Sequence, residues 1–170
     1  MSLHNFSFLT KDIFLAVPEA QASRHYASVA YDGAVTNRPG ARFEPYAIRR
    51  ASHRLCDGTH PLWDCSPAEL LTDYGDLALP NTSLTTLRAE LEPLALDLAR
   101  KHHMCWLGGY HSITLSLPRT YRKLHGRPLV LIHFDAHCDT WQDHFGEPSG
   151  HGTWTYEALN EGLVIPEATI

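Results

Sequence analysis

Acidic and imidazole side chains alternate in the segment 135–139, which reads Asp-Ala-His-Cys-Asp. In extended backbone, the side chains of Asp135, His137 and Asp139 point to the same side. They spread over roughly 13 Å of chain, which is long for one ion and suits a bent segment around two ions about 3.5–4 Å apart. Mixed carboxylate and imidazole donors favour a divalent cation such as Mn²⁺, and Zn²⁺ or Ni²⁺ also fits. The alternative is that these side chains face solvent or cap a helix.

Two further histidines lie in segments that could border such a site. His111 comes two residues after the Gly108-Gly109 pair, and its imidazole is either a further ligand or a structural group. His151 lies between two glycines in a polar loop. A histidine on such a loop beside a metal site can carry protons near neutral pH, and it can equally be a surface residue.

Two other residues near the segment receive structural interpretations. His133 lies within an apolar run, and its side chain would point to the same face as that of Asp135. We expect a buried, hydrogen-bonded imidazole at this position. Cys138 would face away from the ligands, and we expect it to be a small buried residue.

Apolar periodicity predicts the elements that position these residues. Strands are expected at 26–31, 70–76, 104–107 and 129–134, and helices at 45–55, 84–98, 113–125 and 153–161. Strand 129–134 is apolar nearly throughout, which suits a central parallel strand covered on both faces. Pro93 should kink or split the helix 84–98.

Alternating strands and helices predict an α/β fold with a parallel sheet, whose ligands bind at the carboxyl ends of the strands. The segments 108–111 and 135–139 each follow a predicted strand. Nothing in the pattern itself places these two segments side by side, and the only ground for expecting it is that sequential parallel strands are often neighbours.

Composition narrows the class of protein. The 170 residues carry a net charge of −5 and fit one domain, with 1–25 as an N-terminal arm and 26–170 as its α/β part. No basic block supports nucleic-acid binding, and no apolar run approaches the ~20 residues that cross a membrane. A cytoplasmic protein is therefore expected.

The four cysteines show no C-x-x-C spacing and are interpreted as reduced thiols.

Three motifs are similar to successive motifs of the ureohydrolase family, which includes arginase and agmatinase. They read Gly-Gly-Tyr-His-Ser at 108–112, Asp-Ala-His-Cys-Asp at 135–139 and Ser-Gly-His-Gly-Thr at 149–153. The resemblance covers about residues 26–170 and the N-terminal half of the family's length. The His-Gly-Thr of the third motif resembles the agmatinase-like branch. The implied fold is a three-layer α/β/α sandwich around a parallel sheet, incomplete at its C-terminal end.

The resemblance also implies the chemistry. Two Mn²⁺ ions are expected, with His111 and Asp139 on one ion, His137 on the other and Asp135 bridging both. His151 would be the proton shuttle. The expected reaction is hydrolysis of a small guanidino compound, agmatine or similar, to an amine and urea, and relatives assemble as trimers or hexamers. A guanidinase-like relative that uses Ni²⁺ has the same donor types.

The sequence departs from the family pattern in three places. The family's later Ser-x-Asp-x-Asp motif and a guanidinium-binding Glu have no counterpart up to residue 170. Tyr110 stands where the family has Asp, and Glu44 and Tyr46 stand where relatives usually have Gly and Arg. The alternative is therefore a non-catalytic, truncated or degenerate metal-binding domain that acts through protein association. We expect the 170-residue chain alone to be metal-deficient, to release little urea and to associate through an exposed sheet edge.

Overall fold

A computed structural model describes residues 22–55, 59–60, 62–66 and 69–170. The prediction of an arm at 1–25 falls mostly outside these residues. The strands are β1 (Arg24–Val29), β2 (Leu71–Asp76), β3 (Met104–Gly108), β4 (Leu129–Leu131) and β5 (Val164–Thr169). The helices are α1 (Glu44–Ser52), α2 (Leu84–Lys101), α3 (Ser116–His125) and α4 (Trp154–Asn160), with 3-10 turns η3 (Ala41–Phe43) and η5 (His111–Ile113). The predicted α/β class with parallel strands is confirmed.

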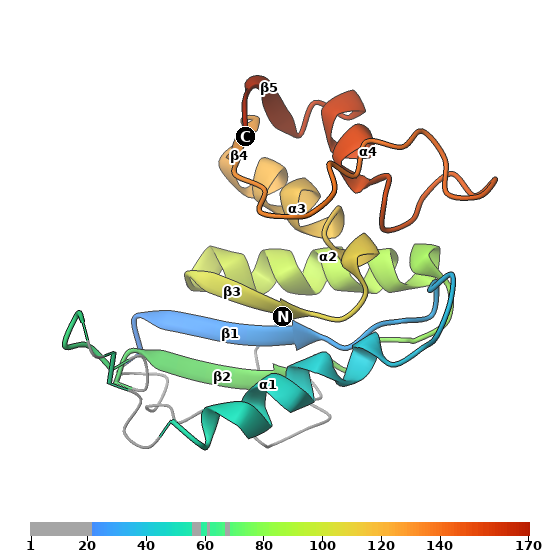
Figure 1. The fold of residues 1–170 in the computed structure, drawn as a ribbon. Coiled ribbons are helices and arrows are strands. Elements are labelled where there is room, and N and C mark those ends of the chain that lie inside the picture. Colours follow the sequence, from blue (N-terminus) through green and yellow to red (C-terminus); the bar gives the residue numbers. More distant parts are fainter. Residues whose placement is uncertain (1–21, 56–58, 61, 67–68) are drawn as a thin grey trace.

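The first sheet has the strand order β2-β1-β3, and all of its strands are parallel. Side chains alternate along β1, so Ala27 and Val29 join the leucines of α2 in one apolar core. Ser28 points to the opposite face, where it meets Arg49 of α1. Helices α1 and α2 therefore cover opposite faces of this sheet (Figure 1).

Helix α2 runs unbroken through Pro93, so the predicted split does not occur. Ser83 caps its first turn by accepting a hydrogen bond from the Thr86 amide at 3.1 Å. Pro93 removes one backbone hydrogen bond to Ala89, and both residues lie on the exposed side of the helix. Water can satisfy that carbonyl, while the buried leucines on the other side hold the helix together.

The second sheet pairs β4 with β5 in parallel. Beneath it lies a smaller core that is built around Trp154 and Leu115. β4 is shorter than predicted, and the side chains of Val130, Ile132 and Phe134 are 64%, 62% and 94% exposed. The prediction of a strand covered on both faces is therefore wrong in the part of the chain that the structure describes, where apolar residues cover only the alternate face.

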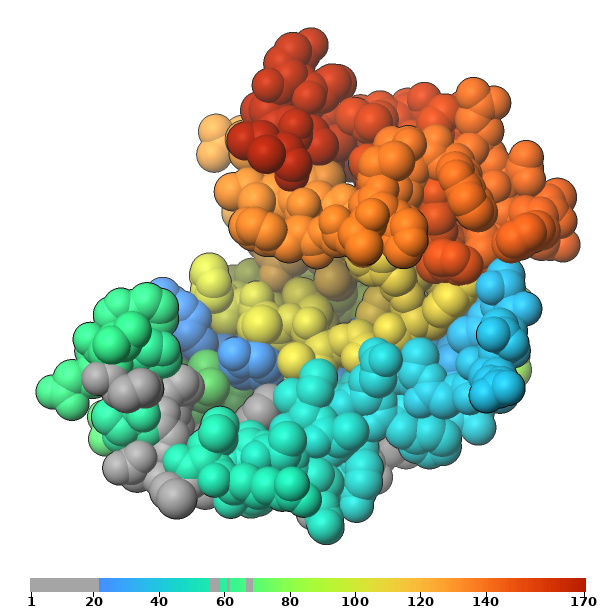
Figure 2. Space-filling view, in the orientation of Figure 1, coloured from blue at the N-terminus to red at the C-terminus, as the bar shows by residue number. Residues whose placement is uncertain are grey.

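Among the described residues no strand pairing joins the two sheets, so β3 and β4 are not neighbours, although they follow each other along the chain. Helices α2 and α3 instead pack against each other and join the two halves (Figure 1). Figure 2 shows the surface hollowed between the first sheet, in blue and yellow, and the orange and red residues of the second half. Of the helices described, none is long and apolar enough to span a lipid bilayer.

A buried ion-pair network fastens α1 to the first sheet. The guanidinium of Arg49, which is fully buried, donates from Nε to Asp73 at 2.6 Å and from Nη2 to the other oxygen of the same carboxylate at 2.8 Å. Nη1 donates to Asp76, and Nη2 also donates to Ser28. This bidentate geometry compensates the cost of removing the charges from water.

Replacing this guanidinium should destabilise the fold strongly. Arg49→Met would remove the guanidinium that two buried carboxylates share, and we expect the free energy of unfolding to fall by about 3–5 kcal/mol. Arg50→Met, one residue along on the exposed side of α1, is the matched control and should change stability by less than ~0.5 kcal/mol. Denaturant unfolding compares the two variants, and equal stabilities would contradict the role given to this network.

Candidate metal centre

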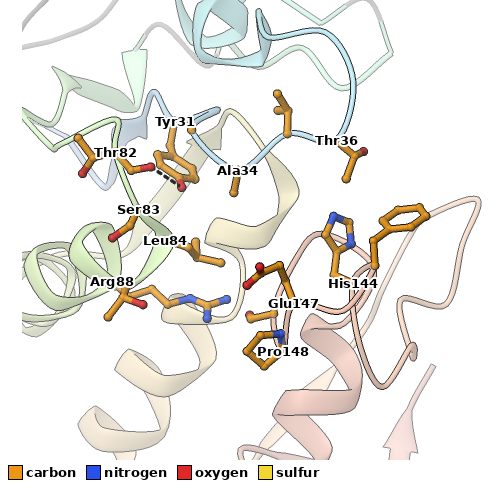
Figure 3. Close-up of a pocket in the computed structure, with 15 residues that line it drawn as sticks. Tyr31, Ala34, Thr36, Thr82, Ser83, Leu84, Arg88, His144, Glu147 and Pro148 are labelled. Carbon is orange, nitrogen blue, oxygen red and sulfur yellow. Dashed lines mark hydrogen bonds between the residues drawn. The ribbon is translucent and has the colours of Figure 1, made fainter.

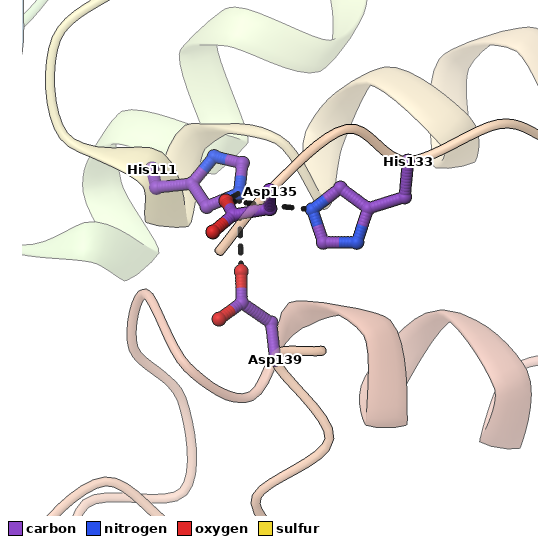
Figure 4. A group of neighbouring side chains, drawn as sticks. All are labelled: His111, His133, Asp135 and Asp139. Atoms are coloured by element: carbon purple, nitrogen blue, oxygen red, sulfur yellow. Dashed lines mark ion pairs between the residues drawn. The ribbon is translucent and has the colours of Figure 1, made fainter. Parts of the chain in front are cut away.

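Four metal-ligating side chains converge beyond the ends of β3 and β4. His111, His133, Asp135 and Asp139 each offer one donor atom, and these atoms all lie within 4.8 Å of one another. Figure 4 shows the two imidazoles and the two carboxylates pointing toward a common point. His111 comes from η5, and the other three come from the segment that follows β4.

His111 is positioned by close backbone packing. The amide of Tyr110 donates to the carbonyl of Tyr31 at 2.7 Å, which ties the loop after β3 to the loop after β1. Gly109 permits this approach, since a Cβ atom there would lie 2.4 Å from the same carbonyl oxygen. Nδ1 of His111 then lies 3.0 Å from the hydroxyl of Thr114, one turn along the chain. This contact directs Nε2 toward the other three donors.

The segment after β4 is bent rather than extended. Oδ1 of Asp135 accepts a hydrogen bond from the His137 amide at 2.9 Å, which forms a tight turn. That hydrogen bond is the main reason why the pKa of Asp135 lies below its ordinary value, so the carboxylate is ionised at neutral pH. Asp139 has a φ of 51°, and this left-handed conformation turns its carboxylate back toward His111.

The indole of Trp154 contacts two of the four donors, His111 and Asp139. Its indole N–H donates to Oδ2 of Asp139 at 2.8 Å and to Nε2 of His111 at 3.1 Å. An indole N–H can only donate, so the second contact requires an unprotonated Nε2 on His111. Burial also lowers the pKa of His111, against the opposing effect of Asp139 and Asp135. We therefore interpret His111 as a neutral imidazole with its proton on Nδ1, and not as the cation of an ion pair.

With Nε2 of His111 unprotonated, several electron-rich atoms lie close together without a proton between them. Nε2 of His111 lies 3.1 Å from Oδ2 of Asp139 and 3.3 Å from Oδ2 of Asp135. Nε2 of His133 is buried, makes no hydrogen bond within the described part of the chain, and lies 3.5 Å from the same oxygen of Asp135. A divalent cation among these atoms would bind all four: the single lone pair of His111 Nε2 would then face the ion, and the indole N–H of Trp154 would keep its hydrogen bond to Asp139. Two imidazoles and two carboxylates suit a borderline or hard metal, so the residues fit the predicted ion.

The structure brings together three of the four predicted ligands, His111, Asp135 and Asp139. His137 lies outside the group. Its side chain is 81% exposed, and its Nδ1 is 3.3 Å from Oδ1 of Asp135, whereas His111 and His133 face the other oxygen, Oδ2. It lines a cavity of about 380 Å³ together with Asp139 and His151. Its assignment as a ligand of a second ion stays a prediction.

His133 is the donor that sequence reasoning missed. Among the described residues its Nε2 has no hydrogen-bond partner, although we expected a hydrogen-bonded imidazole, and this atom faces Asp135 instead. The available signal was the two-residue spacing to Asp135, which places both side chains on one face of the strand. Cys138 is exposed, so its interpretation as a buried residue is wrong. Its thiol contacts the Thr140 hydroxyl at 3.1 Å because the segment is bent.

His151, the predicted proton shuttle, lies at the edge of the site. It lines the 380 Å³ cavity, and its Nδ1 is hydrogen-bonded to the phenol of Tyr110. Beside it, His144 borders a second cavity of about 460 Å³ (Figure 3). Arg88 and Glu147 also line this second cavity, which therefore carries both charge signs. The fold and the donor group together define an α/β protein with a candidate metal centre at the carboxyl ends of its strands.

The sequence matches the Arginase family over residues 25–170, and the chain belongs to that family. It is 38% identical to an agmatinase of Neisseria meningitidis serogroup C in an alignment of 171 positions. The alignment covers 98% of this chain and 55% of the relative. It is also 38% identical to an agmatinase of Chromobacterium violaceum over 85% of this chain and 46% of the relative. The chain thus spans about half the length of the curated relatives it matches.

Solved structures show the same fold. A hypothetical agmatinase from Burkholderia thailandensis superposes with a TM-score of 0.82 at 32% identity, covering 95% of this chain and 54% of that one. The proclavaminate amidino hydrolase of Streptomyces clavuligerus gives a TM-score of 0.80 at 29% identity, covering 95% and 56%. The predicted family and its α/β fold are confirmed.

Asp135 should be essential for metal binding. Its carboxylate faces both His111 and His133, and Asp135→Asn would replace the charge with a neutral amide. Loss of a group that only supports a ligand costs about 10–100-fold in affinity, and we expect at least that for a ligand. Metal analysis and Mn²⁺ titration of the purified protein measure the effect. Glu90→Gln, on the exposed side of α2, is the control. Unchanged metal content in Asp135→Asn would refute the site.

Thr114 should act on the metal only through His111. Thr114→Val keeps the shape of the side chain and removes the hydroxyl that bonds Nδ1. We expect about 10–100-fold weaker Mn²⁺ binding with an unchanged fold. Thr86→Val, at the start of α2, removes an exposed hydroxyl as a control. If both variants bind Mn²⁺ like the original protein, Thr114 does not orient the imidazole.

Proposed function

We propose that the chain is part of a metal-dependent amidinohydrolase of agmatinase type. The proposed reaction is hydrolysis of a small guanidino compound, agmatine or similar, to an amine and urea. Membership of the Arginase family supports the reaction class, and the agmatinases among its relatives support the substrate class. The single observation that carries the proposal is the convergence of four metal donors at the strand ends.

The proposed metal is Mn²⁺, with Ni²⁺ as the alternative that the same donors permit. His111, His133, Asp135 and Asp139 would hold one ion, and His137 would contribute to a second. When bound, a divalent cation activates water as a nucleophile at neutral pH. These four donors would occupy part of the coordination sphere of a Mn²⁺ ion, whose preferred geometry is octahedral.

His151 would carry the proton that hydrolysis requires. Water adds to the guanidino carbon, the bond from that carbon to the substituted nitrogen breaks, and the leaving amine must gain a proton. His151 lines the cavity beside Asp139, and its Nδ1 is already engaged by Tyr110. Nε2 is therefore the atom available for proton transfer. An imidazole serves because its ordinary pKa lies close to neutral pH.

His151→Asn should separate proton transfer from metal binding. In a form of the protein that releases urea, we expect turnover of agmatine to fall by about 10²–10⁴-fold, the usual contribution of an acid–base group, while Mn²⁺ content stays unchanged. Urea release by the Mn²⁺-loaded protein is the measurement, with His125→Asn at the far end of α3 as the control. If a form of the protein that spans the full length of the relatives binds Mn²⁺ and releases no urea from any guanidino compound, the non-catalytic metal-binding alternative replaces this proposal.

A further inference from the structure

A buried phenol connects two histidines beside the candidate metal centre. The hydroxyl of Tyr110 is hydrogen-bonded to Nδ1 of His151 and lies 3.4 Å from Nε2 of His144. The two imidazole rings meet edge to face with their centroids 4.4 Å apart. Tyr110 is 9% exposed and His144 is 4% exposed, so protein groups and not bulk water surround the phenol.

Each member of this network is fixed by its own backbone. Tyr110 is held through its amide, which donates to the Tyr31 carbonyl at 2.7 Å, and its ring packs in the first core. His144 is held by a pair of backbone hydrogen bonds with Glu147, at 2.7 and 3.0 Å. Its ring fills the space beside Gly150, where a Cβ atom would lie 2.2 Å from the imidazole Cγ. The network is therefore built into the fold.

The chemistry of a phenol suits a partner that changes its protonation. A hydroxyl can both donate and accept a hydrogen bond, whereas a carboxylate can only accept. When Nδ1 of His151 is bare, the hydroxyl of Tyr110 can donate to it. When Nδ1 carries a proton, the phenol oxygen can accept from it, and the hydroxyl proton can turn toward His144. Burial lowers the pKa of His144, so its ring is neutral and can take either role.

We propose that Tyr110, supported by His144, is a positioning residue that holds His151 by Nδ1 and keeps Nε2 directed to the cavity beside Asp139. The inference deepens the proposed function and rests on the role given there to His151. It concerns the position where this sequence has tyrosine and the family motif has aspartate. Tyr110 touches neither substrate nor metal in this assignment.

Tyr110→Phe tests the inference because it removes only the hydroxyl. In ¹⁵N-histidine spectra of the protein, recorded at a pH where the ring is neutral, Nδ1 of His151 should show the shift of a hydrogen-bonded nitrogen. In Tyr110→Phe that signal should move toward the value of a freely hydrated imidazole. Tyr31→Phe removes another buried hydroxyl, the one that donates to the Thr82 carbonyl at 3.4 Å, and should leave His151 unchanged.

Kinetics give a second measurement. Tyr110→Phe should lower kcat for agmatine by about 10–100-fold and leave KM and Mn²⁺ content unchanged, since the hydroxyl acts only through His151. A His151 signal that is identical in the original protein and in Tyr110→Phe would overturn the inference, and the spectrum of the original protein alone would overturn it if Nδ1 proves free. A shifted signal without any urea release would uphold the positioning of His151 and reject the proposed reaction.

Discussion

The indole N–H of Trp154 is the contact on which the candidate metal centre depends. Trp154 belongs to the second core, whereas His111 extends from a loop that is packed on the first. By donating to both His111 and Asp139, one N–H joins the two halves of the chain at the site. The contact also fixes chemistry, because a group that can only donate requires two acceptors. Position and protonation of the donor group are thus set by a residue that would not itself bind the ion.

The sequence predicts most of the donor group, and local backbone geometry explains the rest. Asp135 and Asp139 were found because alternation places polar side chains at the end of an apolar strand. His133 follows the same alternation, but its position inside the strand favoured a structural interpretation. His137 was expected to point with the aspartates, which holds only in extended backbone. The turn at Asp135 and the left-handed φ of Asp139 redirect the side chains, and neither is encoded in residue spacing.

The fold was predictable in its class and less so in its connections. Strand and helix alternation gave parallel strands correctly, whereas the neighbourhood of β3 and β4 was inferred from their order along the chain. The structure brings the two loops together by a different route, through the packing of α2 on α3 and through Trp154. Burial of β4 depends on what covers each face, and in the described residues one face stays open. Which faces of a strand are covered depends on tertiary packing, and an apolar run in the sequence does not predict it.

Gly109 gives the site a steric requirement that no donor atom reveals. The loops after β1 and β3 approach so closely that even one methyl group at this residue would overlap the Tyr31 carbonyl. Any larger residue must push the loops apart, and it would carry Tyr110 and His111 with it. In saturation mutagenesis, substitutions at position 109 would therefore group with those that delete a ligand, although the residue offers neither charge nor hydrogen bond to the centre. The mutagenesis data would thus mark Gly109 as part of the site because it has no side chain.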